Sequence, residues 1–456
     1  MSLVSALPLP ASVPNKQKRT HWGNSINGLR SPSPEPRAAK RAKIATAGLR
    51  TPDSEIDEEI ESEFQREEVG ENETVPETQK VLLLRAIKQK YEIVEGYSTP
   101  EIEPSNEDEL VVKVLFVGLN PIDWKSPENS DFGFGIPVLP YLSGRDIVGV
   151  VIKAPANPSS RVQKGDVILS ASTDYRDLRK AAYQSYAIAP SYNVCRVPVS
   201  TPRNSIAGLG VAFIAAVLGL SVCLGIDFGL VEKGPIGPNL RKILQGLDEE
   251  SIPKDVRGEC LTSITDDERP KSGDWIVIWG GSTSTAKLAA QLSKLIGLRV
   301  IKVVDVGKHG EQLSASSADL LVDSHDTERA VQIIRRVTKD NLRFAIDTIG
   351  KSTAELCQQA LKQGSEGLRS HLVALSGLPK EKAEGVVHHN VPIKVHHEIK
   401  EAGEGIMVWL EKLLRDGLVR APEAEIAPGG LEGVNDALDR MRRGEVSGKR
   451  LIVELS

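Results

Sequence analysis

Residues 274–297 read DWIVIWGGSTSTAKLAAQLSKLIG, and this stretch decides the fold of the chain. Five apolar residues, 275–279, end in two glycines, and a segment with helical spacing follows at once. Leu288, Leu292 and Leu295 recur at the spacing of one helix face, which indicates that this face packs against a core. The stretch therefore predicts a buried strand, a tight turn and an amphipathic helix.

Strands and helices keep alternating after this stretch. Strand-like runs occupy 298–306, 342–350 and 370–377, and a helical stretch covers 328–338. Such alternation predicts a doubly wound parallel sheet with helices on its faces. Residues 81–200 differ, because Pro, Gly and Asp separate short strand-like runs there, and this pattern predicts a compact β-rich domain. The predicted fold class is therefore α/β.

The composition argues against several classes of protein. The 456 residues carry 57 basic and 62 acidic side chains, a net charge of −5, and only 4% are aromatic. Proteins that bind nucleic acid normally present a basic face, so we expect no nucleic-acid partner. The four cysteines are scattered, which argues against a disulfide framework and against a four-thiolate zinc lobe. We predict a cytoplasmic protein.

The first 78 residues differ from the rest of the chain. Up to Thr51 they hold nine basic residues and one acid, whereas 53–73 hold eleven acids and one Arg. Few of them can form a core, so we predict a disordered charged arm. KRAK at 40–43 resembles a nuclear import signal, and Ser-Pro or Thr-Pro pairs begin at 31, 33 and 51. Import and kinase partners with a nuclear location are one interpretation, and a solvated tail is the other.

One apolar segment has the length of a membrane span. Residues 206–226 read IAGLGVAFIAAVLGLSVCLGI and carry no charge. The segment is rich in Gly and Ala, which insert weakly into a bilayer, and it lies between two α/β-like regions. We therefore predict a helix buried between two domains and no stable membrane insertion, with a membrane helix as the alternative.

The turn at 280–286 has the features of a dinucleotide site. It follows a buried strand and opens a helix, where backbone amides and the helix N-terminus attract a pyrophosphate. Ser282 and Thr285 stand where a G-x-G-x-x-G motif has its later glycines. An ordinary capped helix is the alternative. We predict that the cofactor-binding residues of the turn are Gly280, Gly281, Ser282, Thr283, Ser284 and Thr285.

Later strand ends carry the other expected cofactor contacts. Asp305 closes the second strand, where an acid accepts hydrogen bonds from the ribose of NAD, whereas Lys308 in the next loop favours the extra phosphate of NADP. Because both are present, the two cofactors stay open at this point. Asp347, Gly350 and Ser376 follow the later strands and are predicted to line the cofactor crevice.

Several further motifs occur in a fixed order. NPIDWK at 120–125 is similar to N-P-x-D-x-K, and PYLSGRD at 140–146 with Gly149 is similar to P-x-x-x-G-x-D-x-x-G. VQKGDVI at 162–168, FAIDTIG at 344–350 and GKR at 448–450 follow as later landmarks. Together they resemble the zinc-independent, quinone-oxidoreductase-like branch of the medium-chain dehydrogenase/reductase superfamily, which includes trans-acting enoyl reductases. The resemblance covers residues 80–456.

The resemblance implies an order of domains. After the arm at 1–78, a GroES-like β domain is expected at 79–205 and a Rossmann cofactor-binding domain at 206–378. A polar insertion, 231–273, interrupts the Rossmann domain. The last segment, 379–456, is expected to complete the GroES-like domain. A homodimer is expected by analogy with the family.

The resemblance also argues against a catalytic zinc ion. Zinc-dependent relatives carry a Cys near 120–123 and a His-Glu pair near 144–146, where this chain has neither a thiol nor an imidazole. The histidine pairs 388–389 and 396–397 do not replace them, because adjacent strand residues point to opposite faces. We predict no metal site, and we predict that these histidines are polar surface residues.

Without a metal, a substrate carbonyl must be polarised by hydrogen bonds or by a cation. Lys125 is the candidate for stabilising an enolate oxygen or holding a substrate carbonyl, with a surface lysine as the alternative. Tyr141 is a second candidate donor, while Asn120 and Asp123 are expected to shape the loop of the cleft. These assignments follow from fold position within the family.

These features favour an NADP(H)-dependent reductase, with NAD as the alternative cofactor. It would transfer hydride to an activated double bond, as in an enone or enoyl thioester, or to a quinone, and its partner would be a small-molecule substrate. The alternative is a catalytically weak redox sensor or interaction protein with a nuclear-targeted arm. The departure from a full glycine motif and the lack of an obvious catalytic acid leave this alternative open.

Overall fold

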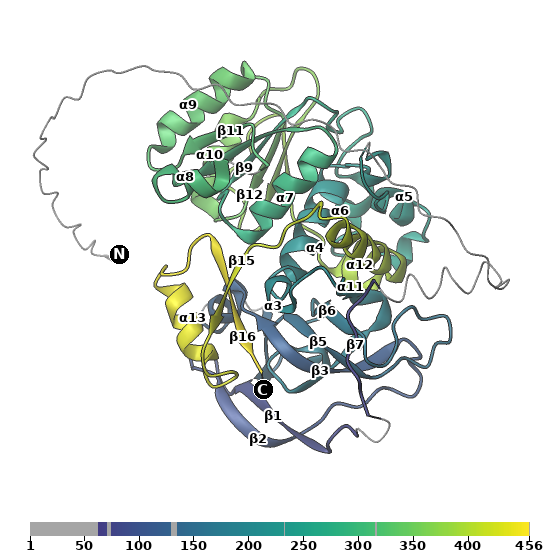
Figure 1. Cartoon of the computed structure of the whole chain (residues 1–456). Helices are drawn as coiled ribbons and strands as arrows, with labels where there is room; N and C mark the ends of the chain where they lie inside the picture. Colours follow the sequence, from purple (N-terminus) through teal and green to yellow (C-terminus); the bar gives the residue numbers. More distant parts are fainter. Residues whose placement is uncertain (1–62, 71–73, 129–134, 232, 315–316, 456) are drawn as a thin grey trace, which may run out of the picture. The chain divides into compact units, whose positions relative to one another are not determined.

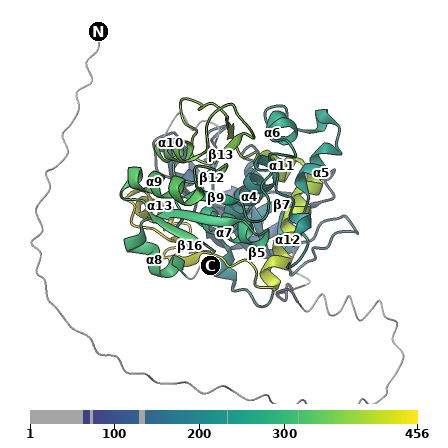
Figure 2. The same ribbon diagram turned by 90° about the horizontal axis from the view of Figure 1, so that it is seen from above.

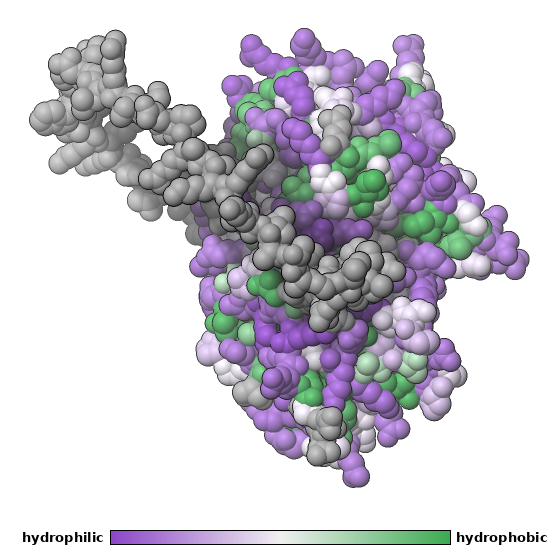
Figure 3. Space-filling model, turned by 45° about the vertical axis from the view of Figure 1, so that its right-hand side comes forward, coloured by the Kyte–Doolittle hydropathy of each residue, from purple (hydrophilic) through white to green (hydrophobic). Residues whose placement is uncertain are grey.

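The computed structural model describes residues 63–70, 74–128, 135–231, 233–314 and 317–455 (Figure 1). The predicted import and phosphorylation motifs, and the arm up to residue 62, lie outside these described residues. The described chain forms one parallel sheet, one mainly antiparallel sheet and one small antiparallel sheet. On the face shown in Figure 3, most described residues are hydrophilic and the hydrophobic ones form separate patches.

The mainly antiparallel sheet has the strand order β15-β16-β3-β5-β6-β8, with β7 paired to β3. Its central strand β5 is buried except at its last residue. Gly149 in β5 permits close packing, because a Cβ there would lie 2.3 Å from the carbonyl oxygen of Lys113. The strands are β3 (Glu109–Gly118), β5 (Asp146–Lys153), β6 (Val167–Ala171), β7 (Tyr186–Pro190), β8 (Val194–Arg196), β15 (Glu423–Ala427) and β16 (Lys449–Glu454). The small sheet contains β1 (Thr78–Leu84), β2 (Glu92–Ser98) and β4 (Tyr141–Leu142).

The parallel sheet has the order β11-β10-β9-β12-β13-β14. Alternate residues of β9 enter different clusters: Ile276 and Ile278 pack with α7, whereas Val277 and Trp279 pack with α9 and α10. The strands are β9 (Trp275–Trp279), β10 (Arg299–Val304), β11 (Leu320–Asp323), β12 (Phe344–Asp347), β13 (Ser370–Ala374) and β14 (Val386–His389). The helices are α7 (Ser284–Leu295), α8 (Val306–Ser314), α9 (Thr327–Thr338) and α10 (Lys351–Ala360) (Figures 1 and 2). The predicted α/β class, with helices on both faces of a parallel sheet, is confirmed.

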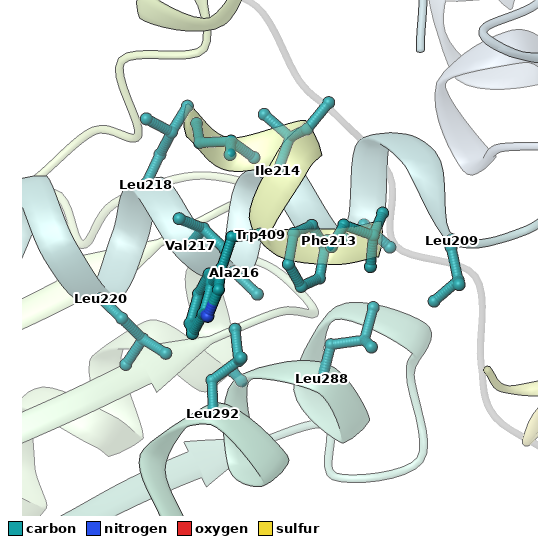
Figure 4. Close-up of a cluster of buried hydrophobic side chains, with 14 of the residues drawn as sticks. Leu209, Phe213, Ile214, Ala216, Val217, Leu218, Leu220, Leu288, Leu292 and Trp409 are labelled. Carbon is teal, nitrogen blue, oxygen red and sulfur yellow. The ribbon is translucent and has the colours of Figure 1, made fainter. Parts of the chain in front are cut away.

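The apolar segment 206–226 is buried inside the protein, as predicted. It forms α4 (Gly210–Leu218) and one turn of π-helix, η4 (Gly219–Cys223), and α4 packs against α7, β5 and β6. Figure 4 shows Phe213 and Val217 of this segment beside Leu288, Leu292 and Trp409. In the described part of the chain, no helix is long and apolar enough to span a bilayer. Burial between strands and helices therefore accounts for the hydrophobicity of the segment.

The described residues contain seven further α-helices. The predicted insertion 231–273 contains α5 and α6, and the chain after β14 contains three further helices (Figure 1). Their bounds are α2 (Pro121–Glu128), α3 (Arg203–Ile206), α5 (Leu240–Gln245), α6 (Arg257–Thr262), α11 (Lys394–Glu398), α12 (Lys400–Arg415) and α13 (Val434–Arg442).

Two segments differ from the boundaries expected from the sequence. Residues 63–70, expected in a disordered arm that extends to 78, lie against the antiparallel sheet, because Arg66 forms a 2.7 Å ion pair with buried Asp166 and Phe64 stacks beneath the Arg196 guanidinium. The segment 379–456 contributes to both large sheets: β14 extends the parallel sheet, whereas β15 and β16 extend the antiparallel one.

Candidate functional site

The turn between β9 and α7 is tight because glycine occupies two crowded positions. Gly280 has φ of +82°, and a Cβ there would lie 2.4 Å from Thr348 Oγ1. A Cβ on Gly281 would lie 2.9 Å from Lys302 Cβ. The amides of both glycines donate to the carbonyl oxygen of Val303, at 3.1 and 2.9 Å. These two predicted cofactor residues therefore shape the turn, while their own N–H groups are already used.

The hydroxyl-bearing residues of the turn have different roles. Thr283 is the N-cap of α7, since its Oγ1 accepts from the amide of Ala286 at 3.2 Å and donates to Thr348 Oγ1 at 3.0 Å. An N-capped helix, which was the alternative to a nucleotide site, is thus present, with Thr283 as its cap. Ser284 and Thr285 begin the helix, where position leaves their amides without intrahelical acceptors. Together with half-buried Ser282, they form the part of the turn that can donate to an anion.

A buried lysine and a half-buried one, Lys302 and Lys287, lie close to this turn, and the sequence reasoning missed both. Lys302 in β10 is 1% exposed, and burial, aided by the charge of Lys287, lowers the pKa of Lys302 to about 8. Burial also lowers the pKa of Lys287, whose Nζ donates to the carbonyl oxygen of Gly448 at 2.6 Å. A lysine at the centre of an otherwise apolar strand, VIKVV, was the available signal.

Asp305 follows β10, as the sequence predicts, whereas Lys308, which was expected in the next loop, lies in the first turn of α8. Asp305 Oδ1 accepts from the backbone amide of Lys308 at 2.9 Å, and its Oδ2 lies 3.5 Å from His325 Nε2. Asp323, at the end of β11, approaches His325 Nδ1 at 3.1 Å, and this contact raises the pKa of His325. His309, which the sequence reasoning left without a role, lies 2.8 Å from the Ser447 hydroxyl. The side chain of Lys308 is exposed.

The loops after β12 and β13 contain the remaining predicted cofactor residues. Asp347 is buried, and its Oδ2 accepts from the amides of Ile349 at 3.2 Å and Gly350 at 2.9 Å. Burial raises the pKa of Asp347 above its usual range, although hydrogen bonds to the carboxylate oppose this shift. Ser376 is half-buried beside Gly377, which has φ of +128°. Asp347 thus positions the loop that begins α10.

The two candidate catalytic residues have different surroundings. Lys125 is half-buried on α2, with its Nζ 5.7 Å from the centre of the Trp124 ring. Tyr141 is 1% exposed in the core of the antiparallel sheet, where its hydroxyl accepts from Arg145 Nη2 at 2.9 Å. Burial raises the pKa of Tyr141, which keeps the phenol protonated. Their roles in catalysis stay predictions.

The loop that begins with Asn120 is held by a buried ionic network. Asp146 Oδ2 accepts from Arg450 Nη2 at 3.0 Å and from Asn120 Nδ2 at 3.2 Å. Its other oxygen accepts from the amide of Val211 at 2.8 Å, in the first turn of α4. Arg450 also donates to Asn120 Oδ1. The network therefore joins the ends of β3 and β5 to β16 and to the helix that leads into the parallel sheet.

The positions that carry zinc ligands in other dehydrogenases have different side chains here. Asp123 is buried and accepts from the amide of Asn120 at 2.8 Å, and burial raises the pKa of Asp123 to about 6. Arg145 is buried, with its guanidinium 3.8 Å from the centre of the Tyr175 ring. Asp123 and Arg145 each have protein partners, and neither 120–123 nor 144–146 holds a thiol or an imidazole.

The expectation that the paired histidines are surface residues is wrong for both pairs. His389 and His396 are fully buried, and His388 and His397 are partly buried. The edge strand β14 is covered by α6, so that His389 Nδ1 lies 2.6 Å from Glu259 Oε1. His397 Nδ1 contacts the Thr173 hydroxyl at 2.8 Å. The prediction of exposure is wrong because residues far away in sequence cover both pairs.

Sequence comparisons match these features to known proteins. Residues 106–199 match the alcohol dehydrogenase GroES-like domain. The trans-enoyl reductase BOA5 of Botryotinia fuckeliana is 24% identical over 390 residues, which cover 80% of this chain and 96% of that protein. The dehydrogenase pigH of Monascus ruber is 25% identical over 384 residues, which cover 77% of this chain and 93% of that protein.

Solved structures share the fold over nearly the same region. The quinone oxidoreductase of Coxiella burnetii has a TM-score of 0.58 and 18% identity, covering 83% of this chain and all of that one. A mycobacterial protein in complex with NADPH has a TM-score of 0.61 and 15% identity, with the same coverage of this chain. The chain therefore contains an alcohol dehydrogenase GroES-like domain beside a doubly wound parallel sheet, and it is similar to trans-enoyl reductases along nearly their full length.

Proposed function

We propose that this protein is an NADP(H)-dependent reductase that transfers hydride to an activated double bond, in an enone or enoyl thioester, or to a quinone. The observation that carries the proposal is the glycine turn between β9 and α7, with Lys287 and Lys302 beside it. An open helix N-terminus and two nearby cations form a positive environment suited to a pyrophosphate.

The residues present fit a dinucleotide. The amides of Ser284 and Thr285 would hold the pyrophosphate, and Asp305 would accept from the adenosine ribose. Lys308 is exposed in the first turn of α8, close to Asp305, where it would meet the extra phosphate of NADP. Ser376 would lie along the nicotinamide. When bound, the nicotinamide supplies the hydride.

The protein's own task is to orient the substrate and polarise its oxygen. We propose that this happens without a zinc ion in the cleft, since Asp123 and Arg145 occupy the regions where a zinc site would need a thiolate and an imidazole. Lys125 is the proposed cation for the developing enolate oxygen, and Tyr141 is the proposed second donor. The buried Asn120–Asp146–Arg450 network positions the loop that leads to Lys125.

The similarities support this assignment in two ways. Several relatives that match over 90% or more of their own length are named trans-enoyl reductases, such as those of Petromyces alliaceus and Aspergillus japonicus. Structures with the same fold include a quinone oxidoreductase and a protein in complex with NADPH. These names include enoyl reduction, quinone reduction and NADPH binding, which are the elements of the activity that we propose for this site.

We expect purified protein to bind NADPH more tightly than NADH, followed through cofactor fluorescence. Lys308→Ala should weaken NADPH binding by roughly tenfold and leave NADH binding unchanged, because it removes one charge-assisted contact to the extra phosphate. Asp305→Asn should weaken NADH binding more than NADPH binding. A preference for NADH in the wild type would assign the cofactor to NAD, and binding of neither would refute the site at the turn.

Turnover separates the reductase from the redox-sensor alternative. With NADPH bound, oxidation of the cofactor by a small enone, an enoyl thioester or a quinone should be detectable and should persist after removal of residues 1–62. Tight NADPH binding with no turnover on any of the three substrate classes would favour the sensor.

We expect the affinity for NADPH to fall as the pH rises through about 8. In this range Lys302 loses the positive charge that attracts phosphate, because burial has lowered its pKa from 10.5 to about 8. Between these two values the unfolded chain binds more protons than the folded one, so the free energy of unfolding of the apoprotein should rise with pH over the same window. The measurements are NADPH titrations and denaturant unfolding at pH 7 and 9.5.

Lys302→Met provides the control for this pH dependence. The variant should bind NADPH more weakly at pH 7 and should lose the fall in affinity at higher pH. Lys254→Met, at an exposed lysine, should behave as the wild type. An unchanged pH profile in Lys302→Met would show that another group titrates.

A further inference from the structure

A buried cluster of polar side chains lies at the edge of the parallel sheet, three strands away from β9. Its members are Cys223 at the end of η4, Glu259 in α6 and His389 at the end of β14. The sulfur, a carboxylate oxygen and a ring nitrogen all lie within 4.8 Å of one another. Cys223 and His389 are fully buried, and the side chain of Glu259 is 14% exposed.

Two further groups extend this cluster in one direction. His371 Nδ1 lies 2.9 Å from His389 Nε2, and His371 Nε2 lies 3.7 Å from Glu268 Oε2. Glu268 is held in place by Arg369, whose Nη2 donates to it at 2.6 Å. The two imidazoles therefore form a chain between the carboxylates of Glu259 and Glu268.

When both carboxylates are ionised, the two imidazoles have one hydrogen too few for the three contacts that link Glu259, His389, His371 and Glu268. A neutral imidazole has one N–H donor and one acceptor nitrogen. If His389 Nδ1–H donates to Glu259, its Nε2 must accept from His371 Nδ1–H, and His371 Nε2 then faces the Glu268 carboxylate with no hydrogen to donate. His371 Nε2 is indeed a buried nitrogen without a hydrogen-bond partner. Such an atom in a buried network costs stability.

A cation bound at His389 Nδ1 removes this deficit. Both imidazoles then take the other tautomer: His389 Nε2–H donates to His371 Nδ1, and His371 Nε2–H points toward Glu268. This arrangement, a ligand histidine whose second nitrogen donates to an oriented group, is common around protein-bound metals. The thiol of Cys223 and the carboxylate of Glu259 are placed to complete the ligand set.

We propose that Cys223, Glu259 and His389 bind a zinc ion that holds the insertion against the sheet. Sulfur, imidazole nitrogen and carboxylate oxygen are the ligand atoms that zinc prefers, and a water molecule fills the fourth position. On binding, the Cys223 S–H bond breaks, its proton leaves to solvent and a sulfur–zinc bond forms. The hydrogen bond between His389 and Glu259 opens as the ion replaces its hydrogen.

This site differs from a catalytic zinc site in place and in role. It joins three segments distant in sequence: η4, the insertion helix α6 and the edge strand β14. Linking such segments stabilises the folded chain by mass action, because the unfolded chain lacks the assembled ligand set. The proposal is independent of the cofactor and of hydride transfer.

Cobalt substitution tests the site directly. The full chain is treated with a chelator, dialysed and titrated with Co²⁺, and the absorption spectrum is recorded. We expect one equivalent to bind with the thiolate-to-cobalt charge-transfer band and the visible bands of a tetrahedral ion, and we expect Zn²⁺ to displace it. The melting temperature should rise with Zn²⁺ in the same preparation.

Three variants make the test specific. Cys223→Ser should lose the charge-transfer band, whereas Cys195→Ser should keep it, because Cys195 is an equally buried thiol near a carboxylate, Glu411, but outside the cluster. His371→Phe should keep the band but bind the ion about 10–100-fold more weakly, since it removes the partner of the ligand histidine. Should Cys223→Ser fail to fold, Glu259→Gln offers a second ligand variant with weakened binding.

Two results would overturn the proposed zinc site. The absence of cobalt bands in the wild type would refute the metal site. A proton on Glu259 would then supply the hydrogen that the two imidazoles and two carboxylates lack. A charge-transfer band that survives in Cys223→Ser would place the ion on a different thiol. Neither result would affect NADPH binding, so failure here is distinguishable from failure of the reductase assignment.

Discussion

Asp146→Ala should lower the free energy of unfolding by about 3–5 kcal/mol, because it leaves the buried Arg450 guanidinium without its counter-charge. Asp146 is fully buried and accepts from Arg450, Asn120 and the amide of Val211. An arginine cannot release its proton to escape this situation. Chemical denaturation at neutral pH, followed by tryptophan fluorescence, measures the change.

The opposite variant, Arg450→Met, should cost less than Asp146→Ala. Burial already raises the pKa of Asp146 and Arg450 opposes that shift, so the carboxyl can take up a proton when the arginine is absent. In Arg450→Met the pKa of Asp146 in the folded state lies above its value in the unfolded chain. The destabilisation caused by this substitution should therefore diminish as the pH falls below that raised pKa. Asp146→Asn with Arg450→Met should recover part of the loss, because no charge stays buried.

Lys449→Met provides a matched control in the same strand. Its ammonium lies 3.4 Å from Glu423, with both side chains about half exposed, and such pairs contribute at most about 1 kcal/mol. An Asp146→Ala variant no less stable than Lys449→Met would refute the view that the buried network joins the loop of Asn120 to α4.

The features that sequence predicts well are those that adjacent residues determine. The turn between β9 and α7 follows from two glycines, a capping threonine and an apolar strand, all within ten residues. The buried segment 206–226 follows from its composition and its place in the chain. In both cases local periodicity and backbone preference agree with the tertiary structure.

The features that sequence missed depend on contacts between distant residues. Arg450 and Asp146 are 304 positions apart, and His389 and Glu259 are 130 positions apart. No local pattern marks a histidine in an edge strand as buried when the covering helix belongs to an insertion elsewhere. The role of Lys302 depends on the packing of α7 above β10, and periodicity shows only that a charge interrupts an apolar run.

Site prediction was limited by the same effect. Thr283 was expected to contact phosphate, yet its hydroxyl caps α7 and bonds to Thr348, a residue from a different strand end. Asp347 was placed in the crevice, where its hydrogen bonds make it a support for the following loop. Sequence identifies which turns surround a cofactor, while the hydrogen bonds decide which side chains remain available to it.

Gly280→Ala should weaken NADPH binding by at least about tenfold and should also lower stability. Two effects add at this position. The backbone has φ of +82°, which costs an L-residue about 1–2 kcal/mol, and the new Cβ would lie 2.4 Å from Thr348 Oγ1 and 2.6 Å from Ile349. Relief requires the turn and the loop after β12 to move apart, and such a shift also moves the amides of Ser284 and Thr285 that we propose hold the pyrophosphate.

Gly273→Ala separates the two effects. Gly273 also has a positive φ, +91°, but a Cβ there would meet nothing within 4 Å. It should therefore lose stability through backbone strain alone and bind NADPH as the wild type does. NADPH titration and thermal unfolding of both variants make the comparison. Equal affinities in the two variants would show that the geometry of the glycine turn does not control cofactor binding, and that the pyrophosphate is held elsewhere.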